Sequence, residues 1–155
     1  MAPLVNTRGP LFVHPKGIVK RTHFYALSMY ANLLQPQVAV SVLNSDRLNG
    51  TLVSMMDAIA TIDKSGKKWS IALINRHPSR SIDCTVKIGS IVIDGTYKAV
   101  VLSGDSPNSY NDIEHPERVI PKEIELIFKK GIVNLTPHSL TIVHVLTEQG
   151  KECVA

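Results

Sequence analysis

The sequence predicts a mainly β protein, an antiparallel β-sandwich of jelly-roll type that follows a short strand, loop and helix. At 155 residues the chain has the length of one domain with its own hydrophobic core. Hydrophobic residues make up 44% and charged residues 19%, and Val, Ile and Thr, which favour strands, are plentiful. From residue 37 onward, short segments of alternating apolar and polar residues are separated by turn residues, as in sandwiches.

The first 34 residues are predicted to form a strand at about 9–14, a loop, and a helix from Thr22 to Leu34. Thr22 is the predicted N-cap of this helix, and Pro36 cannot continue it. Apolar side chains fall on every side of the helix, so we expect other parts of a protein to cover more than one of its faces.

The rest of the chain is predicted to form strands joined by turns, with one long surface loop at 103–121. Turns are expected at Asp63–Gly66 and, as a two-residue hairpin turn, at Asp94-Gly95. The expected domains are 1–34, a sandwich at 35–148 and a tail at 149–155. The predicted strands are 38–43, 55–62, 68–74, 82–88, 91–93, 97–102, 123–128, 132–135 and 139–146.

Charge and hydropathy argue against two classes of partner. The formal charge of +4 comes from scattered Lys and Arg, and aromatic residues are only 5%, so we expect no nucleic acid to bind. No apolar run approaches the ~20 residues of a membrane span, and the N-terminus has no basic segment followed by a hydrophobic one. We therefore expect a soluble protein without a membrane partner, and the sequence leaves its compartment, cytoplasmic or secreted, open.

No catalytic residues are predicted within the chain. Hydrolysis of a glycosidic bond generally needs two carboxylates on opposite sides of that bond. Glu123 and Glu125 alternate with apolar residues on one predicted strand, which places both on the same, solvated face. No Gly-x-Ser-x-Gly turn and no phosphate-binding glycine loop occur in the sequence, and no cofactor is expected.

A metal site is not predicted either. His138 and His144 are the closest His pair, and a strand between them would hold them ~20 Å apart. Cys84 lies on the apolar side of its predicted strand and is expected to be a buried, unreactive thiol. Cys153 lies in the polar tail, so the two thiols match no metal or redox spacing.

Three aromatic residues could bind sugar rings if they were displayed on a flat sheet face: Trp69, Tyr97 and Tyr110. Trp69 shares its face with Ile71 and Leu73, which favours packing in the core. Tyr110 lies in the long loop and is the freest of the three.

Seven motifs, in this order, resemble the C-terminal part of α-L-arabinofuranosidases of glycoside hydrolase family 51. Their order and spacing carry the resemblance, which covers nearly the whole chain. The motifs are Leu4–Thr7, Gly9–Phe12, His14–Thr22, Asn75–Pro78, Ser103–Pro107, Tyr110–Asp112 and Leu135–Ser139, and the helix at Tyr25–Tyr30 after the third of them is part of the same resemblance.

The resemblance implies that residues up to about Leu34 are the last strand, loop and helix of a catalytic (β/α)₈ barrel. The two catalytic glutamates would lie upstream, and the loop 14–22 would border the arabinose pocket. Well-known members read Trp-Arg-Gln-Thr where this chain has Val19-Lys20-Arg21-Thr22. Arg21 replaces the Gln that contacts the sugar, so Lys20 and Arg21 are candidate substrate-binding residues at the pocket rim or plain solvated loop residues.

Three functional hypotheses follow. The first is the accessory C-terminal part of a retaining α-L-arabinofuranosidase acting on arabinan or arabinoxylan, inactive alone, whose partner is the missing barrel of the same polypeptide. The alternative is a stand-alone carbohydrate-binding module with an exposed aromatic platform. The third is a sandwich for subunit contacts, which would form a homo-oligomer through the apolar helix.

Overall fold

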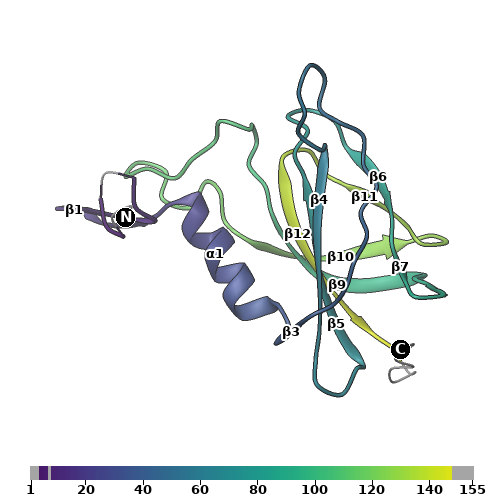
Figure 1. The fold of residues 1–155 in the computed structure, drawn as a ribbon. Coiled ribbons are helices and arrows are strands. Elements are labelled where there is room, and N and C mark those ends of the chain that lie inside the picture. The colour runs from purple at the N-terminus through teal and green to yellow at the C-terminus, as the bar shows by residue number, and fades with distance from the viewer. Residues whose placement is uncertain (1–3, 7, 148–155) are drawn as a thin grey trace.

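The fold is built on one large antiparallel sheet that carries a layer of structure on each face (Figure 1). A computed structural model describes residues 4–6 and 8–147. The six strands of this main sheet lie in the order β10-β9-β12-β5-β4-β3. Their bounds are β3 Gln37–Val38, β4 Met56–Ile62, β5 Lys68–Asn75, β9 Gly95–Leu102, β10 Lys122–Phe128 and β12 Ser139–Leu146.

The second layer of the sandwich consists of two short antiparallel pairs. Strand β6 (Ile82–Thr85) pairs with β11 (Ile132–Leu135), and β7 (Lys87–Ile88) pairs with β8 (Ile91–Val92). Between this layer and the main sheet lies the larger hydrophobic core. Its buried residues are Met56, Ile71, Leu73, Cys84, Val86, Ile93, Ala99, Leu126, Phe128, Val133, Leu135, Val143 and Val145.

The opposite face of the main sheet is covered by the helix α1 (Thr22–Leu33) and by part of the long loop. Val119 of that loop and Met29 of α1 are buried together against the sheet. A second, smaller core results, with Ala72, Leu102, Leu140 and Ile142 as its sheet residues.

Strand β12 is central in the sheet and has both of its faces covered. Ile142 and Val143 are each 0% exposed although they point to opposite faces. A strand buried on both sides needs apolar residues at successive positions, which explains the adjacent Ile142 and Val143.

The mainly β, antiparallel sandwich predicted from the sequence is confirmed. Strands β4, β5, β9, β10, β11 and β12 lie within two residues of their predicted bounds. The turn at Asp63–Gly66 joins β4 to β5, and the N–H of Gly66 donates to the carbonyl of Asp63 at 3.1 Å. Residues 103–121 form the predicted loop between β9 and β10. No helix in the described part of the chain is long and apolar enough to cross a membrane.

The strand predicted at about 9–14 is present, but the prediction of a loop after it was wrong. Strand β1 (Leu11–His14) turns back through Pro15-Lys16 and pairs with a second strand, β2 (Gly17–Lys20). The turn depends on Gly17, whose φ of +142° is a backbone conformation that side chains disfavour. Residues 11–20 are therefore an antiparallel hairpin.

Thr22 is not the N-cap of α1. Arg21 occupies the cap position in an extended conformation, with no side-chain capping hydrogen bond, and Thr22 is the first helical residue. The Thr22 hydroxyl is buried and has no hydrogen-bond partner among the described residues. The helix also ends at Leu33, one residue earlier than predicted, with Leu34 as its C-cap.

The strand predicted at 38–43 is shortened to β3. Ala39 still donates to the carbonyl of Ala60 at 2.9 Å, but the chain then leaves the edge of the sheet. Val40 and Val42 are 102% and 87% exposed. Their alternation with polar residues mimics a half-buried strand, yet these side chains do not reach the core.

The strand predicted at 82–88 is interrupted at Val86, whose N–H donates to the carbonyl of Gly131 at 2.8 Å. The predicted two-residue hairpin turn at Asp94-Gly95 was also wrong. Strand β8 pairs back onto β7 across a turn that contains Gly89, with φ +59°, and not forward onto β9. Asp94 instead accepts a hydrogen bond from the N–H of Lys130 at 2.9 Å.

Candidate functional site

The N-terminal hairpin carries both residues that the sequence nominated as substrate-binding. Lys20 ends β2 and Arg21 follows it as the cap of α1. The Lys20 side chain is exposed, and its Nζ lies 5.4 Å from the centroid of the Phe24 ring, a cation–π contact. Lys20 is therefore a cation held at the surface where the hairpin meets the helix.

Arg21 is half-buried and contacts the first strand of the hairpin and the residues before it. Its guanidinium donates to the carbonyl of Gly9 at 3.2 Å, and its Cζ lies 5.2 Å from the centroid of the Phe12 ring. Its backbone N–H donates to the carbonyl of Pro10 at 2.9 Å. These contacts orient Arg21 along the hairpin, and its place at a sugar pocket stays a prediction.

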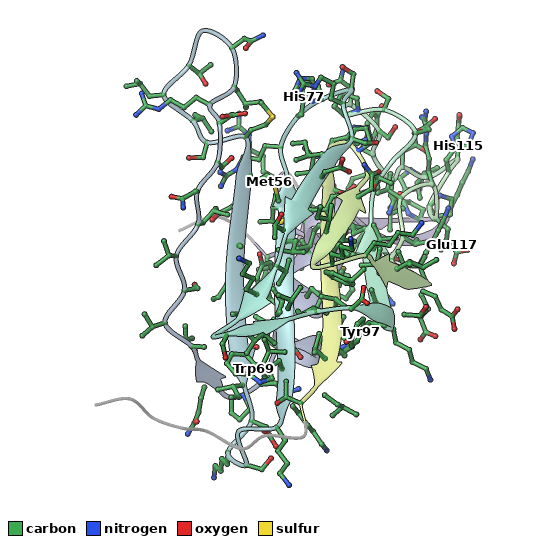
Figure 2. All side chains as sticks on the ribbon, turned by 90° about the vertical axis from the view of Figure 1, so that its right-hand side faces the viewer. Met56, Trp69, His77, Tyr97, His115 and Glu117 are labelled. Carbon is green, nitrogen blue, oxygen red and sulfur yellow. The ribbon has the colours of Figure 1, made fainter. Side chains whose placement is uncertain are left out.

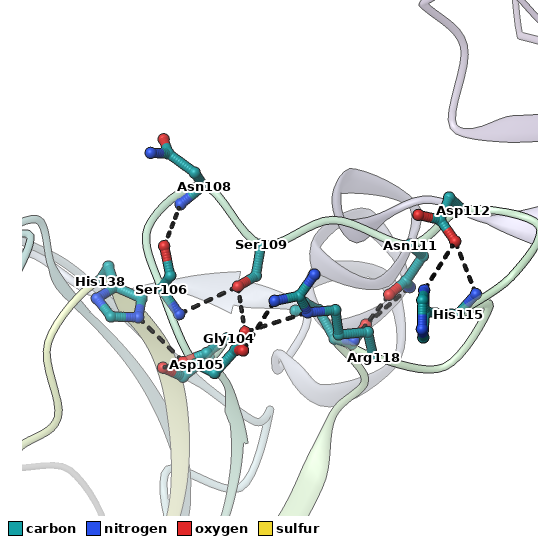
Figure 3. Close-up of polar contacts among 12 residues, drawn as sticks. Gly104, Asp105, Ser106, Asn108, Ser109, Asn111, Asp112, His115, Arg118 and His138 are labelled. Carbon is teal, nitrogen blue, oxygen red and sulfur yellow. Dashed lines mark hydrogen bonds and ion pairs between the residues drawn. The ribbon is translucent and has the colours of Figure 1, made fainter.

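The loop 103–121 is tied together by an ion pair between its two ends (Figure 3). Arg118 donates to both carboxylate oxygens of Asp105, at 3.3 Å from Nε and 2.9 Å from the terminal nitrogen. Ser109 also donates to Asp105. The hydrogen bonds from Arg118 and Ser109 hold the pKa of the Asp105 carboxyl far below its usual value. Asp105 is thus a constitutive anion that shapes the loop.

The loop is anchored at one end to the sandwich by His138. One ring nitrogen of His138 lies 2.9 Å from the carbonyl of Pro78, and the other lies 3.0 Å from the carbonyl of Gly104. Both partners are carbonyl acceptors, and a neutral imidazole carries one N–H, which it donates to one of them. The sequence predicted that His138 and His144 lie too far apart to bind one metal ion. In the structure they have different partners, since His144 contacts Ser70.

At its other end the loop reaches the hairpin. The side-chain amide of Asn111 donates to the carbonyl of Lys20 at 2.9 Å, across 91 positions of sequence. Figure 1 shows the loop extending from the sheet past the start of α1 towards β1. Sequence reasoning missed Asn111, because an Asn in a polar loop predicts only a turn. The candidate site is thus the hairpin end at Lys20 and Arg21 together with the loop residue that holds it.

Glu123 and Glu125 are both exposed on one side of β10, as predicted. Within residues 4–6 and 8–147, no three His, Cys, Asp or Glu side chains gather closely enough to hold a metal ion.

The three aromatic candidates do not form a flat platform. Figure 2 shows Trp69 and Tyr97 on the side of the main sheet that carries the second layer. Trp69 packs against the larger core, and Tyr97 packs edge-on against Phe128 with ring centroids 5.6 Å apart. Tyr110 is 62% exposed in the long loop. This arrangement gives the carbohydrate-binding module hypothesis no support.

Cys84 is buried, as predicted. It is 8% exposed on β6, and burial raises the pKa of its thiol, which keeps it protonated and unreactive. Cys153 lies outside the described residues.

Comparison with known proteins places these features in a family. A model of the α-L-arabinofuranosidase C-terminal domain matches residues 1–139. Comparison with curated protein sequences found no significant match.

Several solved structures share the fold. The α-L-arabinofuranosidase of Thermotoga maritima, solved with arabinose, superposes with a TM-score of 0.82 at 19% identity and covers 94% of this chain. A family 51 enzyme from Thermotoga petrophila gives 0.81 at 19% over 93%, and one from Bifidobacterium longum gives 0.77 at 22% over 94%. The chain spans only 33%, 33% and 29% of those three proteins.

Proposed function

We propose that this chain, which belongs to the α-L-arabinofuranosidase C-terminal domain family, is the accessory region of a larger arabinofuranosidase. The observation that carries this proposal is the match over residues 1–139, which takes in the hairpin and α1 as well as most of the sandwich. The catalytic carboxylates belong to a barrel supplied by sequence outside this chain. The parent enzyme is a retaining glycosidase that releases arabinofuranosyl residues from arabinan or arabinoxylan.

Within this proposal, residues 1–34 are the last part of the barrel, and the sandwich at 35–148 packs against it. The outer side of α1 supports this arrangement, because Leu27 is 61% exposed there although the helix has an apolar sequence. An exposed apolar helix face gains free energy when another protein surface covers it. Lys20 and Arg21 then form part of the rim of the arabinose pocket.

The first experiment tests catalysis directly. The chain alone, incubated with an aryl α-L-arabinofuranoside, releases no phenol above a buffer blank, whereas the full-length polypeptide does. Turnover by the chain alone would overturn the proposal that the catalytic groups lie outside it.

The second experiment tests the supporting role of the sandwich. Leu27→Glu leaves the unfolding of the isolated chain nearly unchanged, because Leu27 is exposed there. In the full-length polypeptide the same change buries a carboxylate against the barrel and lowers stability by about 2 kcal/mol or more. Val92→Glu, at a 47% exposed site on the opposite layer, is the matched control and is mild in both.

Equal effects of Leu27→Glu in the two proteins would contradict docking through α1. The competing outcome is self-association of the isolated chain through the same helix. A dimer that Leu27→Glu dissociates during sedimentation would favour the homo-oligomer in place of barrel docking.

A further inference from the structure

Asn111 is a buried polar side chain of the long loop. It is 3% exposed, and its Nδ2 donates to the carbonyls of Val119 and Lys20, each at 2.9 Å. Its Oδ1 accepts from the N–H of Val119 at 2.7 Å. Both amide hydrogens and the amide oxygen of Asn111 are therefore in use.

These partners require two donors and one acceptor from the side chain at position 111, which an Asn amide supplies. The pair of bonds to Val119 imitates the pairing between two strands and uses one donor and one acceptor. The remaining amide hydrogen is then directed at Lys20. Asp has the same shape but offers no donor when ionised, and it would set a charged oxygen against two carbonyl oxygens. Ala would leave those two carbonyls without their partner.

Val119, to which Asn111 is hydrogen-bonded, is held against the sandwich. Val119 is 2% exposed in the core beneath α1, so its backbone is held by packing. Arg118, which directly precedes Val119, is held by its ion pair with Asp105. Lys20, in contrast, is the last residue of a hairpin that projects beyond the sheet in Figure 1.

We propose that Asn111 is a positioning residue through which the sandwich fixes the end of the hairpin and so sets where Lys20 and Arg21 stand at the sugar pocket. The structural half concerns this chain alone. The pocket half rests on the function proposed above, and the two halves are tested separately.

The structural half is tested by hydrogen exchange on the isolated chain. In Asn111→Ala, the protection factors of the amides at 18–21 fall roughly tenfold, the loss expected for one buried hydrogen bond. Amides of β5 and β12 keep their protection, which shows that the sandwich is still folded. Asn108→Ala is the matched control, because the Asn108 side chain points away from the loop in Figure 3. Unchanged protection at 18–21 in Asn111→Ala would overturn the proposal.

Asn111→Asp is the second variant, and it also covers the case in which the Ala variant does not fold. Protonation of the new carboxyl restores one of the two lost donors. Protection factors at 18–21, corrected for intrinsic exchange, should therefore recover in part as the pH is lowered from 7 to 4. A role in folding alone gives no such local recovery, and its absence would count against the proposal.

The pocket half is tested in the full-length polypeptide that carries this region. Asn111→Ala raises KM for an aryl α-L-arabinofuranoside about tenfold and changes kcat less, because rim residues contact bound sugar and not the reacting bond. If the hairpin loosens in the isolated chain while KM and kcat stay as in the wild type, the assignment of Lys20 and Arg21 to the pocket fails. If the hairpin does not loosen, Asn111 itself is not the positioning residue.

Discussion

The hydroxyl of Ser70 lies 3.0 Å from Nδ1 of His144 on the neighbouring strands β5 and β12. Ser70 is fully buried, and its hydroxyl also accepts a hydrogen bond from the side-chain amide of Gln35, at 3.1 Å. The half-buried His144 is therefore part of a polar row beneath the end of α1. Burial lowers the pKa of this imidazole from its usual 6.5.

The lowered pKa of His144 predicts a loss of stability in mild acid. Between the folded and unfolded pKa values the unfolded chain binds more protons, so the free energy of unfolding falls as the pH drops below about 6.5. His144→Gln removes this contribution, and its unfolding free energy varies less between pH 7.5 and 5 than that of the wild type. Urea denaturation at several pH values measures both slopes. His23→Gln, at an exposed position of α1, keeps the wild-type slope, and equal slopes for His144→Gln and the wild type would contradict the assignment.

Asn75 predicts a large effect on stability. It is 1% exposed, and its Nδ2 shares two hydrogens among the carbonyls of Arg80, Leu135 and Thr136, at 2.9, 3.2 and 2.9 Å. Asn75→Ala leaves buried carbonyls without partners and lowers the unfolding free energy by about 2–4 kcal/mol. The exposed Asn134 makes one side-chain bond, at 2.8 Å. Asn134→Ala is therefore the control, with a loss under about 1 kcal/mol in urea denaturation. Similar losses for both variants would show that the Asn75 contacts add little.

Local pattern predicted five of the six strands of the main sheet, because each is an apolar-rich segment bounded by turn residues. The same reasoning failed at 38–43. Val38, Val40 and Val42 alternate as in a half-buried strand, but the pattern does not say whether a partner strand runs alongside. The hydrogen bond of Ala39 to Ala60 continues the strand pairing with β4 by one residue, and beyond it exposure rises to 102% at Val40.

The candidate site was less predictable than the sheet, because its contacts join distant parts of the sequence. Family resemblance pointed to Lys20 and Arg21, but the residue that contacts Lys20 lies 91 positions away. Asn111 stands in a stretch rich in turn-forming residues, where its local role and its long-range role look alike. Only the fold brings its amide to the end of the hairpin.

Asp63 predicts a second dependence on pH, in stronger acid. Its carboxylate accepts hydrogen bonds from the N–H groups of Lys67 and Lys68 and from the Ser65 hydroxyl, at 3.1, 3.0 and 2.7 Å. These bonds lower its pKa from 3.8 to about 2. A carboxyl whose pKa is lower in the folded than in the unfolded chain stabilises the fold at pH values above its unfolded pKa. That stabilisation is lost as the pH falls to the folded pKa.

Asp63→Asn should therefore have a lower thermal midpoint than the wild type at pH 6. The gap between the two should close as the pH approaches about 2. Calorimetry at pH 6, 4 and 2.5 follows it. Asp46→Asn, at another exposed carboxyl, shows no comparable gap at pH 6. A difference between Asp63→Asn and the wild type that persists unchanged at pH 2.5 would mean that the turn depends on the shape of this side chain and not on its charge.

Cys84 predicts slow thiol chemistry in the folded chain. It is 8% exposed, it faces the larger core from β6, and burial raises the pKa of its thiol. The reacting species is the thiolate, so both burial and the raised pKa slow its reaction with an aromatic disulfide reagent. In a Cys153→Ser background, which leaves one thiol, Cys84 should react at least about tenfold slower at pH 8 than it does in denaturant.

Thr85→Cys, combined with Cys84→Ser, moves the thiol to the exposed neighbouring position of the same strand and should react at nearly the denatured rate. Equal native rates for the two positions would contradict the buried, unreactive role of Cys84.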